Sequence, residues 1–160
     1  MYYYKDYDFR NLTYGRSIKS HLGTMKKYLP DGIKIQFPKV NPVEISDGVL
    51  KIRIYKGTEG YKFIKTLQDK NNEKMSNLRT LQLFNNIEQS VDFQMKINSE
   101  TLIFNENSEL ISLEDLVENL HRSRIVVIAN TPGLWTTDKS YGNTWTVEQI
   151  KAYICVEGCS

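Results

Sequence analysis

Alternating apolar and polar positions predict several short strands in the first two thirds of the chain. The clearest is residues 48–56, GVLKIRIYK, where three aliphatic residues alternate with a lysine, an arginine and a tyrosine. Side chains at positions i and i+2 of a strand share a face, so one face is apolar and the other is cationic and aromatic. The same period of two predicts strands at residues 33–37 and 93–97, and a further strand near 102–104 that continues at 110–111.

Two more strands are predicted near the end of the chain. Residues 125–129, IVVIA, form an unbroken apolar run, which is typical of a strand with both faces covered. Alternation resumes at Trp145, which we expect to pack in the core, but it continues from Ile150 onward in the opposite phase. A change of phase in a strand indicates a bulge, here near Glu148 and Gln149.

Helical spacing of apolar residues predicts a few short helices. Ser112 is a suitable N-cap for a helix from Leu113 to Leu120. Apolar residues also recur at helical spacing between Ser17 and Leu29, so a short helix that ends at Pro30 is expected there. The long stretch 57–90 is rich in lysine, and we expect it to hold a helix around residues 66–84 with a mobile loop at Asn71, Asn72 and Asn77.

The order of these elements predicts a mainly β fold. From residue 48 it is strand, long insertion, strand, strand, helix, strand, loop, strand, which is the order of a five-stranded Greek-key OB-fold barrel with one helix between strands three and four. Periodicity alone also permits another small barrel or an α+β sandwich. We therefore expect an OB-fold domain at 48–156 with a basic insertion at 57–90, and an N-terminal extension at 1–47 that holds an aromatic arm, a short helix and an edge strand.

Charge is unevenly distributed along the chain. The net charge is only +2, yet residues 1–84 hold 16 Lys and Arg against 8 Asp and Glu, and residues 85–160 hold 5 against 11. The basic half is the expected polyanion-binding part, because clustered Lys and Arg are the electrostatic footprint of nucleic-acid binding. The alternative is that both halves are simply solvated and the asymmetry is chance.

Aromatic residues accompany the cations in three places. The N-terminal arm holds five tyrosines and a phenylalanine among Lys5, Arg10 and Arg16, and it either stacks on bases, docks onto another subunit or packs on its own domain. The second place is the strand at 48–56, and the third is the loop between the last two strands. The residues expected to neutralise phosphates are Lys51, Arg53, Lys56, Lys62, Lys65 and Lys139, and those expected to stack on bases are Tyr55, Phe63, Trp135 and Tyr141.

The C-terminal part also carries a family resemblance. The pattern P-G-L-W, a polar turn and Y-G-N-T-W-x-V-x-Q-I resembles the single-stranded-DNA-binding proteins of large DNA viruses, and more distantly those of phages, over about residues 91–154. The resemblance implies an OB fold and sequence-independent binding of single-stranded DNA in viral replication or recombination. It also implies an intracellular protein, in the host cytoplasm or nucleus at sites of viral replication, that self-associates. Phage members end in an acidic, aromatic-tipped tail, so this chain either lacks tail-mediated recruitment or is truncated.

Two other function classes are weaker. A structural or interaction module on the same barrel, binding a virion component or a host partner, would use the aromatic arm for subunit contacts. An enzyme is not expected, because the sequence shows no phosphate-binding glycine loop and no nucleophile motif. Cys155 and Cys159 lack a partner pair at zinc spacing, so we expect free thiols, no metal and no cofactor. No apolar stretch approaches the ~20 residues of a membrane span.

Overall fold

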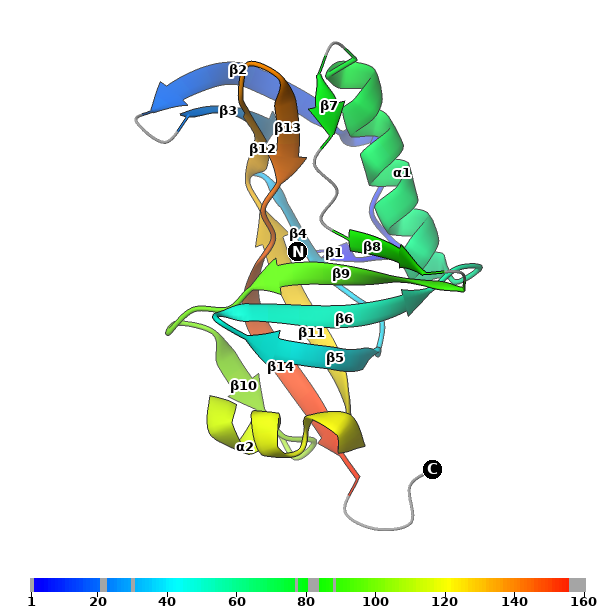
Figure 1. Ribbon diagram of the computed structural model, residues 1–160, viewed down its shortest axis with the longest axis vertical. Helices are drawn as coiled ribbons and strands as arrows, with labels where there is room; N and C mark the ends of the chain where they lie inside the picture. The colour runs from blue at the N-terminus through cyan, green and yellow to red at the C-terminus, as the bar shows by residue number, and fades with distance from the viewer. Residues whose placement is uncertain are drawn as a thin grey trace.

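The computed structural model describes residues 2–20, 23–29, 31–76, 78–80, 84–87 and 89–155, and it contains two β-sheets and two α-helices (Figure 1). The larger sheet has nine strands, in the order β1 (Tyr2–Tyr3), β4 (Ile33–Gln36), β11 (Ser123–Thr131), β14 (Thr146–Ile154), β9 (Ser90–Lys96), β6 (Val49–Tyr55) and β5 (Asn41–Ser46), with β10 (Leu102–Phe104) beside β14 and β8 (Phe84–Ile87) beside β9. The smaller sheet has five, in the order β2 (Thr13–Ser20), β3 (Gly23–Leu29), β12 (Gly133–Thr136), β13 (Ser140–Asn143) and β7 (Arg79–Thr80). The fold is therefore mainly β.

The larger sheet closes into a barrel because residues 33–46 pair at both of its ends. β4 pairs with β11, while β5, which follows after a short connection, pairs with β6 at the other end of the strand order. Between them Val40 forms an antiparallel bridge with Ile125 of β11. Closure removes the free edges that an open sheet would leave.

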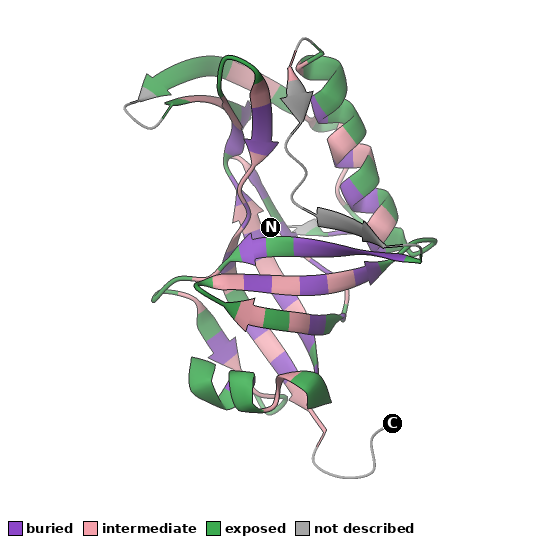
Figure 2. Cartoon of the chain, viewed as in Figure 1, coloured by how far each residue is buried: buried purple, intermediate pink, exposed green. Residues whose placement is uncertain are grey.

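The barrel interior is lined by the alternate positions that the sequence pattern indicated. Leu50 and Ile52 of β6 and Ile125 and Val127 of β11 are fully buried, and Figure 2 shows β6 alternating between buried and intermediate positions. Trp145 is only 3% exposed and contacts the rings of Phe37 and Phe93, with centroid separations of 5.4 and 6.2 Å. Its expected place in the core is confirmed.

The barrel begins one strand earlier than the sequence order suggested. Residues 33–46 supply its first strand, so the predicted boundary between an extension and a domain falls inside the β5–β6 hairpin, at the Asp47–Gly48 turn. The strand at 48–56 is thus the second of the barrel. The basic insertion connects β6 to β9, which pair antiparallel with each other over their whole length. A five-stranded Greek-key barrel is not confirmed, since the sheet contains further strands.

The bulge predicted in the last strand is present. Ile128 of β11 pairs with Gln149, and the next residue, Ala129, pairs with Val147, so Glu148 has no partner residue in the ladder. One extra residue on a strand shifts the following side chains to the other face. This explains why Val147 and Ile150 both point into the barrel although they are three positions apart.

Both helices begin at side-chain caps. Helix α1 (Glu59–Lys74) begins earlier than expected, with the Thr58 hydroxyl accepting a hydrogen bond from the Tyr61 N–H, and it passes through Asn71, which was expected in a loop. Asn77 lies outside the described residues. Helix α2 (Leu113–Glu118) has the predicted cap at Ser112, whose hydroxyl and the Asp115 carboxylate form a capping box. Short 3₁₀ turns occupy Phe9–Asn11 and Leu120–Arg122.

The helix predicted between Ser17 and Leu29 is wrong, because this segment forms the β2–β3 hairpin. Ile18 lies directly opposite Met25 across the two strands. The loop predicted between the last two strands of the barrel is a hairpin, β12–β13, whose strands pair from Leu134 to Asn143. This second hairpin joins the first through β3 and so extends the smaller sheet beyond the barrel.

The N-terminal arm packs onto its own domain, which was one of the three alternatives. Tyr7 and Phe9 contact the Phe63 ring, with centroid separations of 6.0 and 5.4 Å, and Tyr4 is 9% exposed. At the other end of the described chain Cys155 is disulfide-bonded, not the free thiol that was expected; Cys159 lies outside the described residues. Among the helices that the structure describes, none is long and apolar enough to cross a membrane.

Gly133 is a position in the smaller sheet that has no room for a side chain. A Cβ there would lie 2.2 Å from the Lys26 carbonyl oxygen and 2.7 Å from the Lys27 Cα, both backbone atoms of β3. We expect Gly133→Ala to lower the free energy of unfolding by about 1–3 kcal/mol, because β3 and β12 must separate to admit the methyl group. The control is Gly57→Ala, because a Cβ at Gly57 would meet no atom within 4 Å although the φ of this residue is 90°. Urea unfolding of both variants separates the effect of the steric clash at Gly133 from the effect of backbone strain at Gly57.

Candidate nucleic-acid interface

The smaller sheet presents one face to helix α1 and the other to solvent (Figure 1). Residues directly opposite each other in an antiparallel pair point to the same side. Leu134 and Asn143 form such a pair, and their side, which includes Tyr28, faces the helix. Trp135 and Met25 form the next pair, so their side chains lie on the outer face.

A buried polar network fixes the inner face to α1. The Asn71 side-chain oxygen accepts hydrogen bonds from the hydroxyls of Tyr14 and Tyr28, at 2.8 and 2.9 Å. The Asn71 amide donates to the Asn143 oxygen at 3.0 Å, and the Asn143 amide donates to the Tyr28 hydroxyl at 2.8 Å. Desolvation raises the pKa of Tyr28, so this hydroxyl stays protonated and can donate. The network braces the hairpins of the smaller sheet against the helix.

The outer face carries an apolar surface with cations beside it. We call this surface the Trp135 face, and it comprises Ile18, Met25, Lys27, Leu29 and Trp135. Ile18 and Leu29 are 51% and 44% exposed, and Met25 and Trp135 are half-buried. A half-buried indole among exposed aliphatic side chains is unusual for a solvated sheet face, and it is typical of a surface that stacks or docks.

The indole of Trp135 lies across a glycine of the neighbouring strand. Gly142 is its cross-strand partner, and a Cβ on Gly142 would lie 2.7 Å from Cζ2 of the ring. The missing side chain lets the ring rest against the strand backbone. One face of the indole is therefore supported, and the side chain keeps a fixed place on the sheet while it remains half-exposed.

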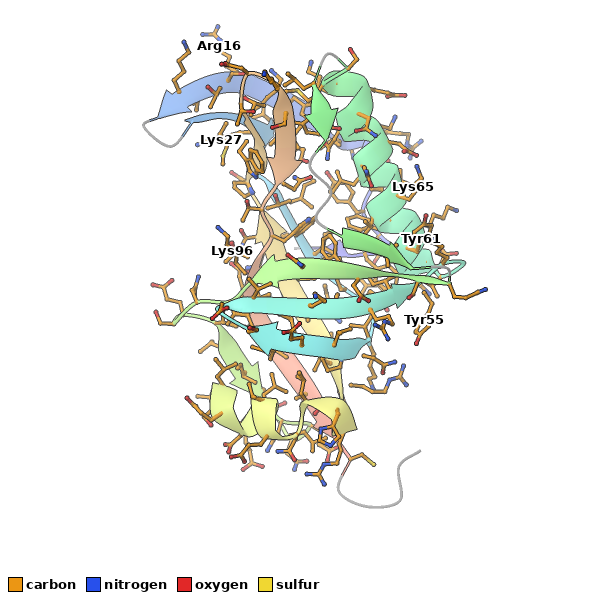
Figure 3. All side chains as sticks on the ribbon, in the orientation of Figure 1. Arg16, Lys27, Tyr55, Tyr61, Lys65 and Lys96 are labelled. Carbon is orange, nitrogen blue, oxygen red and sulfur yellow. The ribbon has the colours of Figure 1, made fainter. Side chains whose placement is uncertain are left out.

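Cationic side chains lie within and beside the Trp135 face. Lys27 and Arg16 are exposed, and Figure 3 shows both on the same side of the molecule as Lys96, which is exposed at the end of β9. Lys139, predicted from sequence, is exposed in the turn of the β12–β13 hairpin. Met25 and Lys27 were missed in the sequence because the region that holds them was assigned to a helix. Arg16 was noted only as a cation of the N-terminal arm, and Lys96 was not singled out.

The cationic face of β6 is less available than the sequence suggested. Lys51 forms an ion pair with Glu44, with 3.5 Å between Nζ and Oε2. Arg53 forms one with Asp92, with 3.0 Å between Nε and Oδ1, and this hydrogen bond raises the pKa of Arg53. A cavity of about 240 Å³ beside Lys51 is also lined by two acids, Glu44 and Asp47. Any phosphate at Lys51 or Arg53 would have to compete with these carboxylates.

The remaining predicted residues are not gathered in one place. Tyr55, which is 47% exposed, lies with Tyr61 and Lys65 on the side of the molecule opposite Lys27 and Lys96 (Figure 3). Lys56 and Lys62 are exposed near the start of α1, while Lys65 forms an ion pair with Asp69 at 2.7 Å.

Two predicted stacking residues are in the core. Phe63 is 4% exposed and Tyr141 is 2% exposed. Phe63 packs against Phe9 and Phe37 on the inner side of α1, and the Tyr141 hydroxyl donates to the side-chain oxygen of Asn72. The sequence could not show that Phe63 points inward, because its helix was predicted to begin only after it. Neither ring is placed to stack on a base.

Within the described ranges, no three His, Cys, Asp or Glu side chains come together in a way that could hold a metal ion. The residues described above form a surface: an aromatic ring, aliphatic side chains and flanking cations on one sheet face. Such a surface suits an extended ligand that has flat apolar groups and negative charges.

Comparison with known proteins gives a likeness of fold. No protein-family model matches this sequence, and no curated protein sequence matches it. Among solved structures, the chain is similar to gp2.5, a single-stranded DNA binding protein encoded by bacteriophage T7, with a TM-score of 0.54, 10% identity, and coverage of 81% of this chain and 91% of that one. It is also similar to the single-stranded DNA-binding protein from bacteriophage Enc34, with a TM-score of 0.51, 10% identity, and coverage of 93% of both chains.

These likenesses show that the protein has the OB-like fold of phage single-stranded-DNA-binding proteins. They extend over most of the chain, whereas the sequence resemblance covered only about residues 91–154. Both structures are of phage proteins, the group that the sequence resembled more distantly, and they give no specific support for the proteins of large DNA viruses.

Proposed function

We propose that the protein binds single-stranded DNA without sequence preference and that the Trp135 face stacks its bases. The observation that carries the proposal is the half-buried indole on the outer face of the sheet, which rests on Gly142 within a hairpin that connects the last two strands of the barrel. OB folds grip oligonucleotides with the loop at this position. The likeness of the fold to two phage proteins described as single-stranded-DNA-binding supports the same conclusion.

Each group on the Trp135 face has a role in this proposal. A base stacks on the exposed face of the indole, and a neighbouring base lies against Met25 and Ile18. Lys27, Arg16 and Lys139 are then near the sugar-phosphate backbone, where they displace condensed counterions. Every base has a π face, so these contacts are independent of sequence.

The other residues predicted from sequence would contribute to DNA binding to different extents. Tyr55, Lys56 and Lys62 are exposed and would contact a strand that continues toward α1. Lys51, Arg53 and Lys65 would contribute less, because each already has a carboxylate partner. The biological setting we propose is the replication or recombination of viral DNA inside the host cell.

A second candidate function is an interaction module. It is favoured by several exposed apolar side chains at the end of the molecule opposite the Trp135 face. There Leu110, Leu113 and Val117 are 66%, 37% and 44% exposed. In that case the Trp135 face would be a protein contact, and the lysines would remain in solvent.

Fluorescence anisotropy with labelled oligonucleotides separates the two functions. We expect oligo-dT and mixed-sequence single strands to bind with similar affinity and duplex of the same length to bind more weakly, with quenching of tryptophan emission. The logarithm of affinity should fall linearly with the logarithm of salt concentration, with a slope of about −0.7 for each phosphate neutralised. Equal affinity for duplex, or no binding at low salt, would rule out the proposed function and favour the interaction module.

A further inference from the structure

A groove lies on the side of β4, β11, β14 and β10 that faces away from the barrel interior. Its volume is about 400 Å³, and its lining includes Phe104, Val126, Ile128, Lys151 and Tyr153. In Figure 1, β11 and β14 pass behind β5, β6 and β9, so the groove is on the far side of the barrel from the β6 face. The strands of the site that OB folds commonly use are not part of it.

Strand register explains why these side chains share the groove. Val126 pairs with Lys151 across β11 and β14, and Arg124 pairs with Tyr153. Phe104 of β10 pairs with Lys151 from the other side. Because the alternate residues Ile125, Val127 and Ile150 fill the barrel, these side chains project outward. The bulge at Glu148 keeps Lys151 and Tyr153 on this outer side.

One end of the groove carries three cations around a tyrosine. Nζ of Lys39 is 3.7 Å from the centroid of the Tyr153 ring, and Nζ of Lys151 is 5.6 Å from it. Arg124, the cross-strand partner of Tyr153, is exposed. No acidic side chain in the described part of the chain forms an ion pair with any of the three.

The acidic side chains of the described segments that line the groove do not form ion pairs with these three cations. Glu148 already forms an ion pair with Lys34, with 2.6 Å between Nζ and Oε2. Glu106 and Glu109 belong to the loop that contributes Ser108 to the lining, and the Glu109 side chain accepts a hydrogen bond from Asn105. The groove therefore combines an apolar floor, formed by Val126, Ile128 and Phe104, with a positive end.

We infer that this groove is a second contact site for single-stranded DNA, which holds a nucleotide downstream or upstream of the Trp135 face. The base lies against the apolar floor, and the phosphate lies at Arg124, Lys39 and Lys151. The volume is within the range of about 300–1,000 Å³ that is common for small-ligand sites. The inference rests on the proposed function, because it assigns a further part of the same strand.

The two sites are joined by short stretches of the chain, although they lie on different sheets. The β12–β13 hairpin that bears Trp135 continues directly from β11 and returns into β14. Trp135 and Val126 are nine residues apart, which is at most about 30 Å at about 3.3 Å per strand residue. A strand of DNA that follows β11 can therefore contact both, whereas a very short oligonucleotide contacts only one.

A charge reversal in the groove tests the inference with oligonucleotides of two lengths. Lys151→Glu should weaken binding of oligo-dT of about 20 nucleotides about tenfold and reduce its salt slope by about 0.7, because one phosphate contact is lost. Binding of oligo-dT of about 6 nucleotides, which the Trp135 face holds alone, should change less than about twofold. Lys70→Glu, on the exposed side of α1, is the matched control for net charge, and it should change both affinities equally and slightly.

Photocrosslinking of the unmodified protein gives a second readout that no folding defect can affect. Oligo-dT that carries 5-iodouracil should label the peptide containing Tyr153 only when the oligonucleotide is long, and the peptide containing Trp135 at both lengths. If the short oligonucleotide binds but Lys151→Glu matches Lys70→Glu and no groove peptide is labelled, the second site is ruled out and the proposed function stands. If neither length binds, the proposed function itself fails.

Discussion

Trp135→Ala should weaken the binding of oligo-dT roughly 5- to 100-fold while leaving the protein folded. A stacked base contributes about 1–3 kcal/mol, and about 1.4 kcal/mol corresponds to a tenfold change in affinity. The indole is half-buried on the outer face of the sheet and is not part of the hydrophobic core, so its removal opens no core cavity. Anisotropy titrations of both proteins at one salt concentration measure the effect.

Two further measurements make this prediction specific to stacking. Trp135→Phe should recover most of the affinity, because it keeps an aromatic ring at the same place on the sheet. The salt slope should be the same in Trp135→Ala as in the unmodified protein, since no cation is removed. Unchanged affinity in Trp135→Ala, with an unchanged urea midpoint, would show that the bases stack elsewhere.

Asn71→Leu should lower the free energy of unfolding by about 2–4 kcal/mol. The change keeps a similar volume but removes the acceptor of two tyrosine hydroxyls and the donor to Asn143. A buried polar group that loses its partner costs about 1–3 kcal/mol, and Tyr28 is almost fully buried. Urea unfolding followed by circular dichroism measures the change.

Lys70→Ala is the matched control for this variant, because Lys70 precedes Asn71 on the same helix but is exposed. Its effect should stay within about 0.5 kcal/mol. We also expect Asn71→Leu to weaken DNA binding, since the network holds the inner side of the sheet whose outer side bears Trp135. A loss of less than about 0.5 kcal/mol in Asn71→Leu would mean that the tyrosines find other partners and that the network does not brace the sheet.

The strands with strict alternation could be predicted from sequence, and so could one irregularity. In β6 the apolar positions have a single phase, and in β14 the change of phase at Glu148 indicated the bulge that the structure contains. The cap at Ser112 likewise fixed the start of α2. These signals are local, because side-chain period and capping depend only on near neighbours in the chain.

The features that depend on distant partners were not predictable in the same way. Ile18 and Met25 have helical spacing, yet they are cross-strand partners in a hairpin whose second strand pairs with β12, more than 100 residues later. Tertiary pairing overrides such a weak local preference. The strand at residues 33–37 was predicted, but it was assigned to the N-terminal extension and not to the barrel, because Pro38 and Pro42 bound it as an edge strand or a linker.

The candidate site was predicted only in part for the same reason. Trp135 and Lys139 were found because an aromatic and a cation stood in a segment with no evident core role. Phe63 and Tyr141 had the same chemistry, and only packing distinguishes them. Sequence also showed Lys51 and Arg53 as a cationic face, but Asp92, which pairs with Arg53, belongs to a strand that lies beyond the whole insertion.

The double pairing of residues 33–46 determines when the barrel can be completed during synthesis. The ribosome releases β4 early, but its partner β11 ends at Thr131, so almost the whole chain must emerge before β4 can pair. β5 and β6 form their hairpin at once, as it is local. A nascent chain thus carries a half-paired first strand for most of its translation, and barrel closure is a late step that depends on contacts distant in sequence.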